Sequence, residues 1–155
     1  MNTDIRTPGI TELAPILQLV HESFDEQIAP WYTPEGIQQF YKFIDARAVQ
    51  ERFGKDHQMF VAYCDGRLAG MIEVRNVQHI SMLFIHNDFR GAGIGTSLLR
   101  HAAGYLEQLG AKTVTVNSSP NSVGFYRGNG FIPVQEEQAV HGIRFIPMEL
   151  GLDGA

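Results

Sequence analysis

The sequence predicts an α/β fold with a mixed sheet. In the first third of the chain, apolar residues recur with the 3.6-residue period of amphipathic helices. The middle third holds short apolar runs separated by turn residues, which is typical of β-strands. In the second half, strands and helices alternate, and this order of elements favours an α/β architecture.

Length and composition narrow the class of protein. The chain has 155 residues, of which 44% are hydrophobic and 19% charged, and its formal net charge is −5. We expect one globular domain spanning residues 1–155, and the acidic balance argues against nucleic acid as a partner. No apolar run approaches the ~18 residues of a membrane span, so no membrane partner is expected. The single cysteine and the lack of a signal-peptide pattern predict a cytoplasmic protein.

Two helices are expected in the first third, after a short extended piece around Ile5. Thr11 is in position to cap the first helix, and its apolar positions follow at helical spacing: Leu13, Ile16, Leu17, Val20 and Phe24. Thr33 and Pro34 supply an N-cap and a first-turn proline for the second helix. Its apolar positions are Ile37, Phe40, Tyr41, Ile44 and Ala48.

The middle third predicts three strands. Residues 59–64 and 68–75 form a hairpin, because Asp65-Gly66 between them is a strong two-residue turn signal. Residues 79–85 form the third strand, bounded by Asn76 on one side and by Asn87-Asp88 on the other.

The clearest helix of the chain spans residues 94–109, with Gly110 as its C-cap. A strand over 112–116 and a short helix over 122–129 are expected next. Residues 131–134 and 143–150 form a final strand pair. This last pair is either the edge of a monomer or the interface of a homodimer.

A glycine-rich turn precedes the helix at residue 94. Gly91, Gly93 and Gly95 let backbone amides approach a ligand closely, and the first turn of the helix leaves its own amides unpaired. These amides and the positive end of the helix dipole predict a phosphate or pyrophosphate site. Additional donors are Arg90, Thr96 and Ser97. The alternative is a glycine-rich turn that holds no ligand.

Two common phosphate-binding motifs do not fit this turn. A Walker A loop requires Gly-Lys-Ser/Thr, and no lysine stands here. The dinucleotide fingerprint requires glycine where Thr96 stands. That fingerprint also follows the first strand of a βαβ unit, whereas this turn lies in the middle of the chain, after several strands.

The turn does resemble a different signature. Residues 90–95, Arg-Gly-Ala-Gly-Ile-Gly, are similar to the (Gln/Arg)-x-x-Gly-x-(Gly/Ala) pattern of the GNAT superfamily of N-acetyltransferases. Residues 117–131, NSSPNSVGFYRGNGF, resemble that family's second motif, which ends in an aromatic-Tyr pair, three residues and Gly-Phe. The order of elements fits over nearly the whole chain. The resemblance implies a mixed, mostly antiparallel sheet flanked by helices, the GNAT-like acyl-CoA N-acyltransferase fold.

The resemblance implies acetyl-CoA as co-substrate and assigns residues to it. The pyrophosphate would be wrapped by Arg90, Gly91, Ala92, Gly93, Ile94, Gly95, Thr96 and Ser97. The pantetheine arm would pair with the backbone of Leu83, Phe84 and Ile85, and the Leu83 N–H would act as oxyanion donor. Hydrogen bonds from the following loop are expected from Ser119 and Asn121. The alternative for the strand residues is a purely structural, buried role.

Tyr126 is the expected general acid. Attack of an amine on acetyl-CoA expels a thiolate, and a phenol within reach can protonate it. The alternative for the Phe125-Tyr126 pair is core packing. Two residues are candidates for the base that deprotonates the amine: His79, at the head of the strand that carries Leu83, and Glu73 on the preceding strand. A structural role is the alternative for His79.

The acceptor is expected to be a small-molecule or peptide amine. Trp31 and Tyr32, which lie in a loop between two prolines, are the candidates to contact it. The histidines lack the paired spacing of a zinc site, so no metal is expected. Cys64 has no basic neighbour, which favours direct attack in a ternary complex over an acetyl-cysteine intermediate. Two alternatives remain: a non-catalytic acyl-CoA-binding or sensor domain of the same fold, and a nucleotide- or dinucleotide-binding domain.

Overall fold

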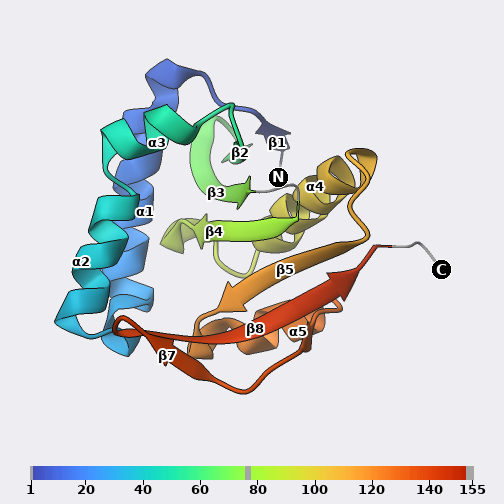
Figure 1. Ribbon diagram of the computed structural model, residues 1–155. Helices are drawn as coiled ribbons and strands as arrows, with labels where there is room; N and C mark the ends of the chain where they lie inside the picture. Colours follow the sequence, from blue (N-terminus) through green and yellow to red (C-terminus); the bar gives the residue numbers. More distant parts are fainter. Residues whose placement is uncertain (1, 76–77, 153–155) are drawn as a thin grey trace.

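A computed structural model describes residues 2–75 and 78–152, and these residues contain a mixed sheet (Figure 1). The strands run in the spatial order β1-β2-β3-β4-β5-β8-β6, and β7 also pairs with β8. Every strand pair is antiparallel except the parallel pair β4–β5. The strands are β1 (Thr3–Arg6), β2 (His57–Cys64), β3 (Arg67–Arg75), β4 (His79–Ile85), β5 (Thr113–Ser118), β6 (Ile132–Pro133), β7 (Gln138–Val140) and β8 (Ile143–Gly151).

Helices cover both faces of this sheet, with α1 to α3 on one side and α4 on the other (Figure 1). The helices are α1 (Leu13–Gln27), α2 (Pro34–Phe43), α3 (Ala46–Arg52), α4 (Ile94–Gln108) and α5 (Val123–Gly128). Short 3₁₀ turns are η1 (Ile10–Glu12), η2 (Ala29–Trp31), η3 (Asn87–Phe89) and η4 (Pro120–Ser122). The predicted fold class is therefore confirmed.

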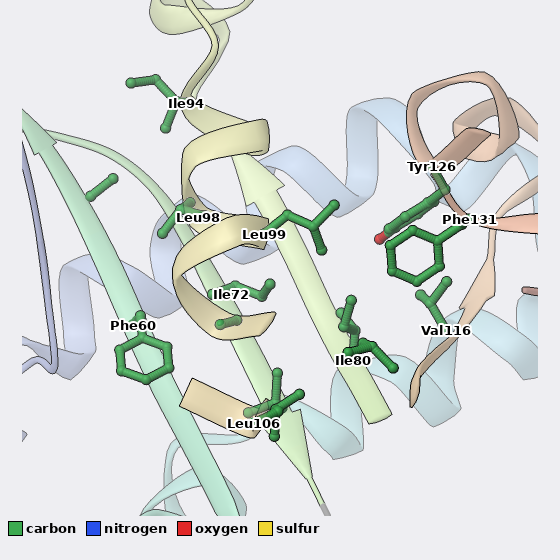
Figure 2. Close-up of a cluster of buried hydrophobic side chains, with 14 of the residues drawn as sticks. Phe60, Ile72, Ile80, Ile94, Leu98, Leu99, Leu106, Val116, Tyr126 and Phe131 are labelled. Atoms are coloured by element: carbon green, nitrogen blue, oxygen red, sulfur yellow. The ribbon is translucent and has the colours of Figure 1, made fainter. Parts of the chain in front are cut away.

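Strand β2 shows how the sequence produces two cores. Its residues are apolar without interruption from Met59 to Cys64, because alternate side chains enter different cores on the two faces of the sheet. Met59 and Val61 pack with α1 and α3, whereas Phe60, Ala62 and Cys64 pack on the α4 side. Figure 2 shows this second core, with Phe60, Leu98 and Leu106 among its members.

The predicted hairpin, third strand and long helix are confirmed. Asp65 and Gly66 both have positive φ, as a two-residue hairpin requires. Strand β4 spans the expected residues, although its expected boundary residue Asn76 lies outside the described residues. Gly110 follows α4 with φ +95°, the left-handed conformation of a C-terminal glycine cap.

Two helix predictions are wrong in detail. Thr11 does not cap α1, because it lies within η1 and α1 begins at Leu13. The second helix ends at Phe43 rather than continuing through Ala48. It stops because the Asp45 carboxylate caps a new helix, accepting from the Arg47 and Ala48 amides at 3.2 and 3.3 Å.

Strand β7 was not expected from the sequence. It joins β8 through a tight turn at His141 and Gly142, both of which have positive φ. The tip of this hairpin reaches the N-terminus of α2, where the Thr33 amide donates to the Gly142 carbonyl at 2.9 Å. The hairpin thereby closes one end of the molecule beside the splayed strands described next.

Candidate active site

The parallel strands β4 and β5 separate shortly after they begin. Their ladder contains the pairs His79–Thr115 and Ile80–Val116, and in the described residues it extends no further. Figure 1 shows the two strands diverging toward their arrowheads. From Ser81 onward, the edge of β4 on the β5 side therefore lacks strand pairing, and the two strands move apart.

Two cavities occupy this space. The larger, here named the glycine-loop cleft, has a volume of about 520 Å³ and is lined by Gln27, Leu83, Ile85, Phe89, Arg90, Gly91, Gly93, Ile94, Gly95, Thr96, Asn121, Ser122, Phe125 and Tyr126. The smaller, here named the splay cavity, has a volume of about 90 Å³ and is lined by Ile28, Tyr32, Phe40, Ile80, Ser81, Met82, Leu83, Phe84, Val116, Asn117, Ser118, Ser119, Ser122 and Tyr126. Both share Leu83, Ser122 and Tyr126, so they meet at these three residues.

The glycine-rich turn forms one wall of the larger cleft. Gly91 and Gly93 have φ +79° and +82°, which side chains rarely adopt, and no atom lies within 4 Å of where their Cβ would stand. Glycine is thus required here for backbone conformation. The first-turn amides of α4, at Ile94, Gly95 and Thr96, have no intrahelical carbonyl to pair with. All three residues line the cleft.

Gly95 has a different role from the other two glycines. A Cβ at this position would lie 3.1 Å from the Phe125 ring, so glycine permits α4 and α5 to pack closely. Arg90 and Thr96 line the cleft, as predicted for residues around a phosphate group. Ala92 and Ser97 belong to the same loop and helix turn but do not line it, and the Ser97 amide donates to the Gly93 carbonyl.

Tyr126 stands at the junction of the two cavities. Its ring packs edge-on against Phe125 and Phe131, with centroids 5.1 and 5.3 Å away (Figure 2). Burial raises the pKa of its phenol, so the hydroxyl is protonated at neutral pH. The side chain belongs to the core and also lines both cavities, and its role as general acid stays a prediction.

The β4 residues predicted to hold a cofactor alternate along the cleft. Leu83 lines both cavities, and Ile85 lines the glycine-loop cleft. The Phe84 side chain lies on the other face of the sheet, where it packs against Phe40 with ring centroids 6.0 Å apart. Phe84 lines the splay cavity but not the glycine-loop cleft. A cofactor role for Phe84 therefore rests on its backbone alone.

Ser119 and Asn121 stay predictions as cofactor ligands. Asn121 lines the glycine-loop cleft, but its side-chain amide donates to the Gln27 carbonyl at 3.0 Å. Ser119 lines the splay cavity, and its hydroxyl lies 2.7 Å from Asn121 Oδ1. Both side chains thus already have partners within the protein.

Sequence reasoning missed a contact across the larger cleft. Gln27 at the end of α1 bonds to Asn87 in η3 through its side chain, at 3.3 Å, and accepts from Asn121 through its carbonyl. Residues about 60 and 94 positions away in sequence thereby meet at one helix end. No local pattern in the sequence signals this contact.

Glu73, one of the two candidate bases, is held in an ion pair. It is 1% exposed, and its carboxylate oxygens lie 3.1 and 3.2 Å from two guanidinium nitrogens of Arg52. Burial raises the pKa of the Glu73 carboxyl, and Arg52 opposes the rise. The side chain lines neither cavity, and its contact with Arg52 is a structural one.

His79, the other candidate, lies where β4 and β5 are still paired. Its Nδ1 is 2.8 Å from the Thr115 hydroxyl, and it lines neither cavity. Burial, followed by the charge of Arg75, lowers the pKa of His79 to about 4. An imidazole with this pKa is a weak base at neutral pH.

Of the two residues predicted to contact the acceptor, one lines a cavity and the other does not. Tyr32 lines the splay cavity and packs edge-on against Phe24 at 5.3 Å. Trp31 lines neither cavity, and the Arg144 guanidinium lies 5.1 Å above its ring.

Within residues 2–75 and 78–152, no group of three or more His, Cys, Asp or Glu side chains is placed to hold a metal ion. None of the described helices has the length and apolar character needed to cross a membrane.

Solved structures of other proteins share this architecture. A GCN5-related N-acetyltransferase from Rhodopseudomonas palustris aligns with a TM-score of 0.85 at 21% identity, covering 98% of this chain and 97% of that chain. The PaiA N-acetyltransferase of Thermoplasma acidophilum, solved in complex with coenzyme A, aligns with a TM-score of 0.77 at 22% identity, covering 98% and 100%. The fold is therefore that of this superfamily.

The sequence itself identifies the family. Residues 28–152 match the family described as the acetyltransferase (GNAT) domain. An uncharacterized N-acetyltransferase of Methanocaldococcus jannaschii is 36% identical over 86 residues, covering 54% of this chain and 36% of that protein. The aligned segment thus spans little more than a third of that relative's length. The chain belongs to the GNAT acetyltransferase family, an acyltransferase family, as its motifs predicted.

Proposed function

We propose that this chain transfers the acetyl group of acetyl-CoA to a primary amine by direct attack in a ternary complex. The observation that carries the proposal is the meeting of the two cavities at Leu83, Ser122 and Tyr126. One cavity offers unpaired amides and Arg90 to a polyanionic co-substrate, and the other leaves room for an acceptor. Reacting groups that enter from the two sides would meet beside the unpaired edge of β4.

Each step assigns a role to a group at this junction. The amine nitrogen attacks the thioester carbonyl, and the Leu83 N–H donates to the oxygen as negative charge develops. The C–S bond then breaks, and the Tyr126 hydroxyl gives its proton to the departing thiolate. Its raised pKa keeps the phenol in the protonated form that this role needs. The proton lost by the amine passes to solvent, and solvent returns a proton to the Tyr126 phenolate.

The position of Cys64 supports direct attack. Its side chain is fully buried on the α4 side of the sheet, 3.4 Å from the Thr3 hydroxyl, and it lines neither cavity. An acetyl-cysteine intermediate would require a thiolate in contact with the acetyl group.

Exchange of Tyr126 for phenylalanine tests the proposal. We expect Y126F to lose 100-fold or more of its turnover, on the order of a general-acid contribution, while acetyl-CoA binding is retained. The readouts are CoA release with a panel of amines and thermal stabilisation by acetyl-CoA. Tyr105→Phe is the matched control, because Tyr105 lies on α4, packs against Phe60 of β2 and lines neither cavity.

Three results would contradict the proposal. Stabilisation by NAD or ATP but not by acetyl-CoA would indicate a nucleotide-binding domain. Binding of acetyl-CoA without turnover on any amine would indicate a sensor. Unchanged turnover in Y126F would remove Tyr126 from the mechanism. At 100 times its dissociation constant, a specific ligand stabilises the fold by about 2.7 kcal/mol, which a thermal scan resolves.

A further inference from the structure

The lining of the splay cavity carries no charge among the described residues. Its polar groups are the Asn117 amide and hydroxyls from Tyr32, Tyr126 and the serines Ser81, Ser118, Ser119 and Ser122. The titratable side chains that line either cavity are Tyr32, Tyr126 and Arg90. Burial raises the pKa of both tyrosines, so neither accepts a proton at neutral pH.

The two bases expected from the sequence are bound elsewhere. Glu73 is paired with Arg52 on the α1–α3 side of β3, and His79 is bonded to Thr115 at the closed end of the splay. Neither side chain lines the splay cavity, and no carboxylate stands in the lining to receive a second ammonium group. The cavity therefore suits a compact acceptor whose amine loses its proton to solvent.

Ser81 indicates what else the acceptor carries. Its Oγ is buried and has no hydrogen-bond partner within the described part of the chain, although the residue lines the splay cavity. An unpaired buried hydroxyl is destabilising, and a polar group of a ligand can supply the missing hydrogen bond. Ser81 and Leu83 both line the splay cavity and are two residues apart on β4, where Ser81 lies at an irregularity in the pairing with β3. A neutral polar group near the amine would therefore reach Ser81 while the amine lies beside Leu83.

We propose that the splay cavity takes α-amino amides, in which a primary amine stands next to an uncharged carbonyl group, in preference to alkylamines and polyamines. This inference rests on the proposed acetyl transfer. The same chemistry is offered by a free amino-acid amide and by the N-terminus of a peptide. In both, the carbonyl group accepts from the Ser81 hydroxyl and makes the amine less basic.

The size of the preference follows from acid–base chemistry. An α-amino group has a pKa near 7.8 and an alkylamine one near 10.4, so at pH 7.5 about a third of the former and roughly 0.1% of the latter are neutral. Without a protein base, the ratio of these fractions, roughly 250-fold, sets the upper limit of the preference in kcat/KM, because the less basic amine is also the weaker nucleophile.

Steady-state kinetics on matched acceptors test the inference. We expect alaninamide to exceed 2-aminobutane by about two orders of magnitude in kcat/KM at pH 7.5, and spermidine to be a poor substrate. The rate with 2-aminobutane should rise tenfold per pH unit from 7 to 9, whereas that with alaninamide should level off above about 8. An alanyl tripeptide amide distinguishes the two sources, because only an open cavity admits the longer chain.

Ser81→Ala separates the contact from acid–base chemistry. We expect a several-fold higher KM for alaninamide, no change for 2-aminobutane, and unchanged acetyl-CoA binding. Ser23→Ala is the control, because Ser23 is a buried serine of α1 that lines neither cavity. Equal changes for both acceptors would overturn the role of Ser81.

Two other outcomes would overturn the inference while leaving acetyl transfer intact. One is a 2-aminobutane profile that levels off far below the pKa of that amine, which would reveal a protein base. The other is preference for spermidine over alaninamide. Turnover with none of these amines, despite stabilisation by acetyl-CoA, would instead overturn the proposed function itself.

Discussion

Arg52 and Glu73 form an ion pair in the interior, between α3 and β3. Arg52 is 13% exposed by its side chain, stacks on Phe43 at 3.8 Å, and donates to the Phe43 carbonyl. All of these contacts hold the charge of Arg52 in one place. The carboxylate that the sequence offered as a base is thus required to neutralise a buried guanidinium.

Glu73→Gln should destabilise the fold by about 3–5 kcal/mol, because it leaves the charge of Arg52 buried and unpaired. Chemical denaturation measures this loss. Asp88→Asn removes one partner of the exposed Arg67–Asp88 pair and should cost far less stability, because solvent screens this pair. A 100-fold loss of turnover with unchanged stability would contradict our assignment and make Glu73 a base.

His79 makes a prediction about pH. Its pKa in the folded protein is about 4, below the unfolded value near 6.5. As pH falls from 6.5 toward 4, the unfolded state takes up the proton first, so the free energy of unfolding should decrease across this window. His79→Gln should remove that part of the pH dependence. An NMR titration of wild-type His79 with a midpoint near 6.5 would contradict the prediction.

At the scale of elements, the β7–β8 hairpin meets α2 through two glycines. A Cβ on Gly142 would collide with the Thr33 hydroxyl, and one on Gly36 would collide with the Gly142 carbonyl. Tyr32 also forms an isolated bridge with Ile143. This contact fixes the segment that carries Tyr32 into the wall of the splay cavity.

Gly142→Ala should destabilise the fold by more than Gly110→Ala. Both positions have positive φ, which costs an alanine roughly 1–2 kcal/mol, but no atom lies within 4 Å of a Cβ at Gly110. The clash at Gly142 adds about 1–3 kcal/mol. Denaturation gives the difference, and KM for the amine should rise more than KM for acetyl-CoA. Equal destabilisation by the two substitutions would show that the hairpin yields without strain.

Elements with strong local signals were predictable. Period, cap and turn residues located α4, the Asp65-Gly66 hairpin and β4, and the glycine motif located the wall of the larger cleft. Elements that depend on distant partners were not. Strand β7 has three residues and, in the described part of the chain, pairs only with β8; the break before α3 depends on one capping carboxylate.

At the scale of the whole molecule, the sheet carries two cores and opens at one seam. Apolar side chains on both faces of β2 and β3 pack against the two helical layers. Strand β4 pairs with β5 in parallel over a short ladder before the two strands separate. The two cavities lie where these strands separate, and Tyr126 lines both of them. The order of helices and strands along the chain gives no measure of how far two paired strands diverge.

The sequence by itself determined the family, the long elements and the glycine-rich turn, because helical period, turn glycines and capping groups act over a few residues. The tertiary structure decided which side chains reach the cavities. It excluded Glu73 and His79 from the lining, retained Tyr126 and Tyr32, and added Ser81 and Gln27. The reason is physical: whether a polar side chain faces a cavity or a partner depends on packing between residues far apart in the chain.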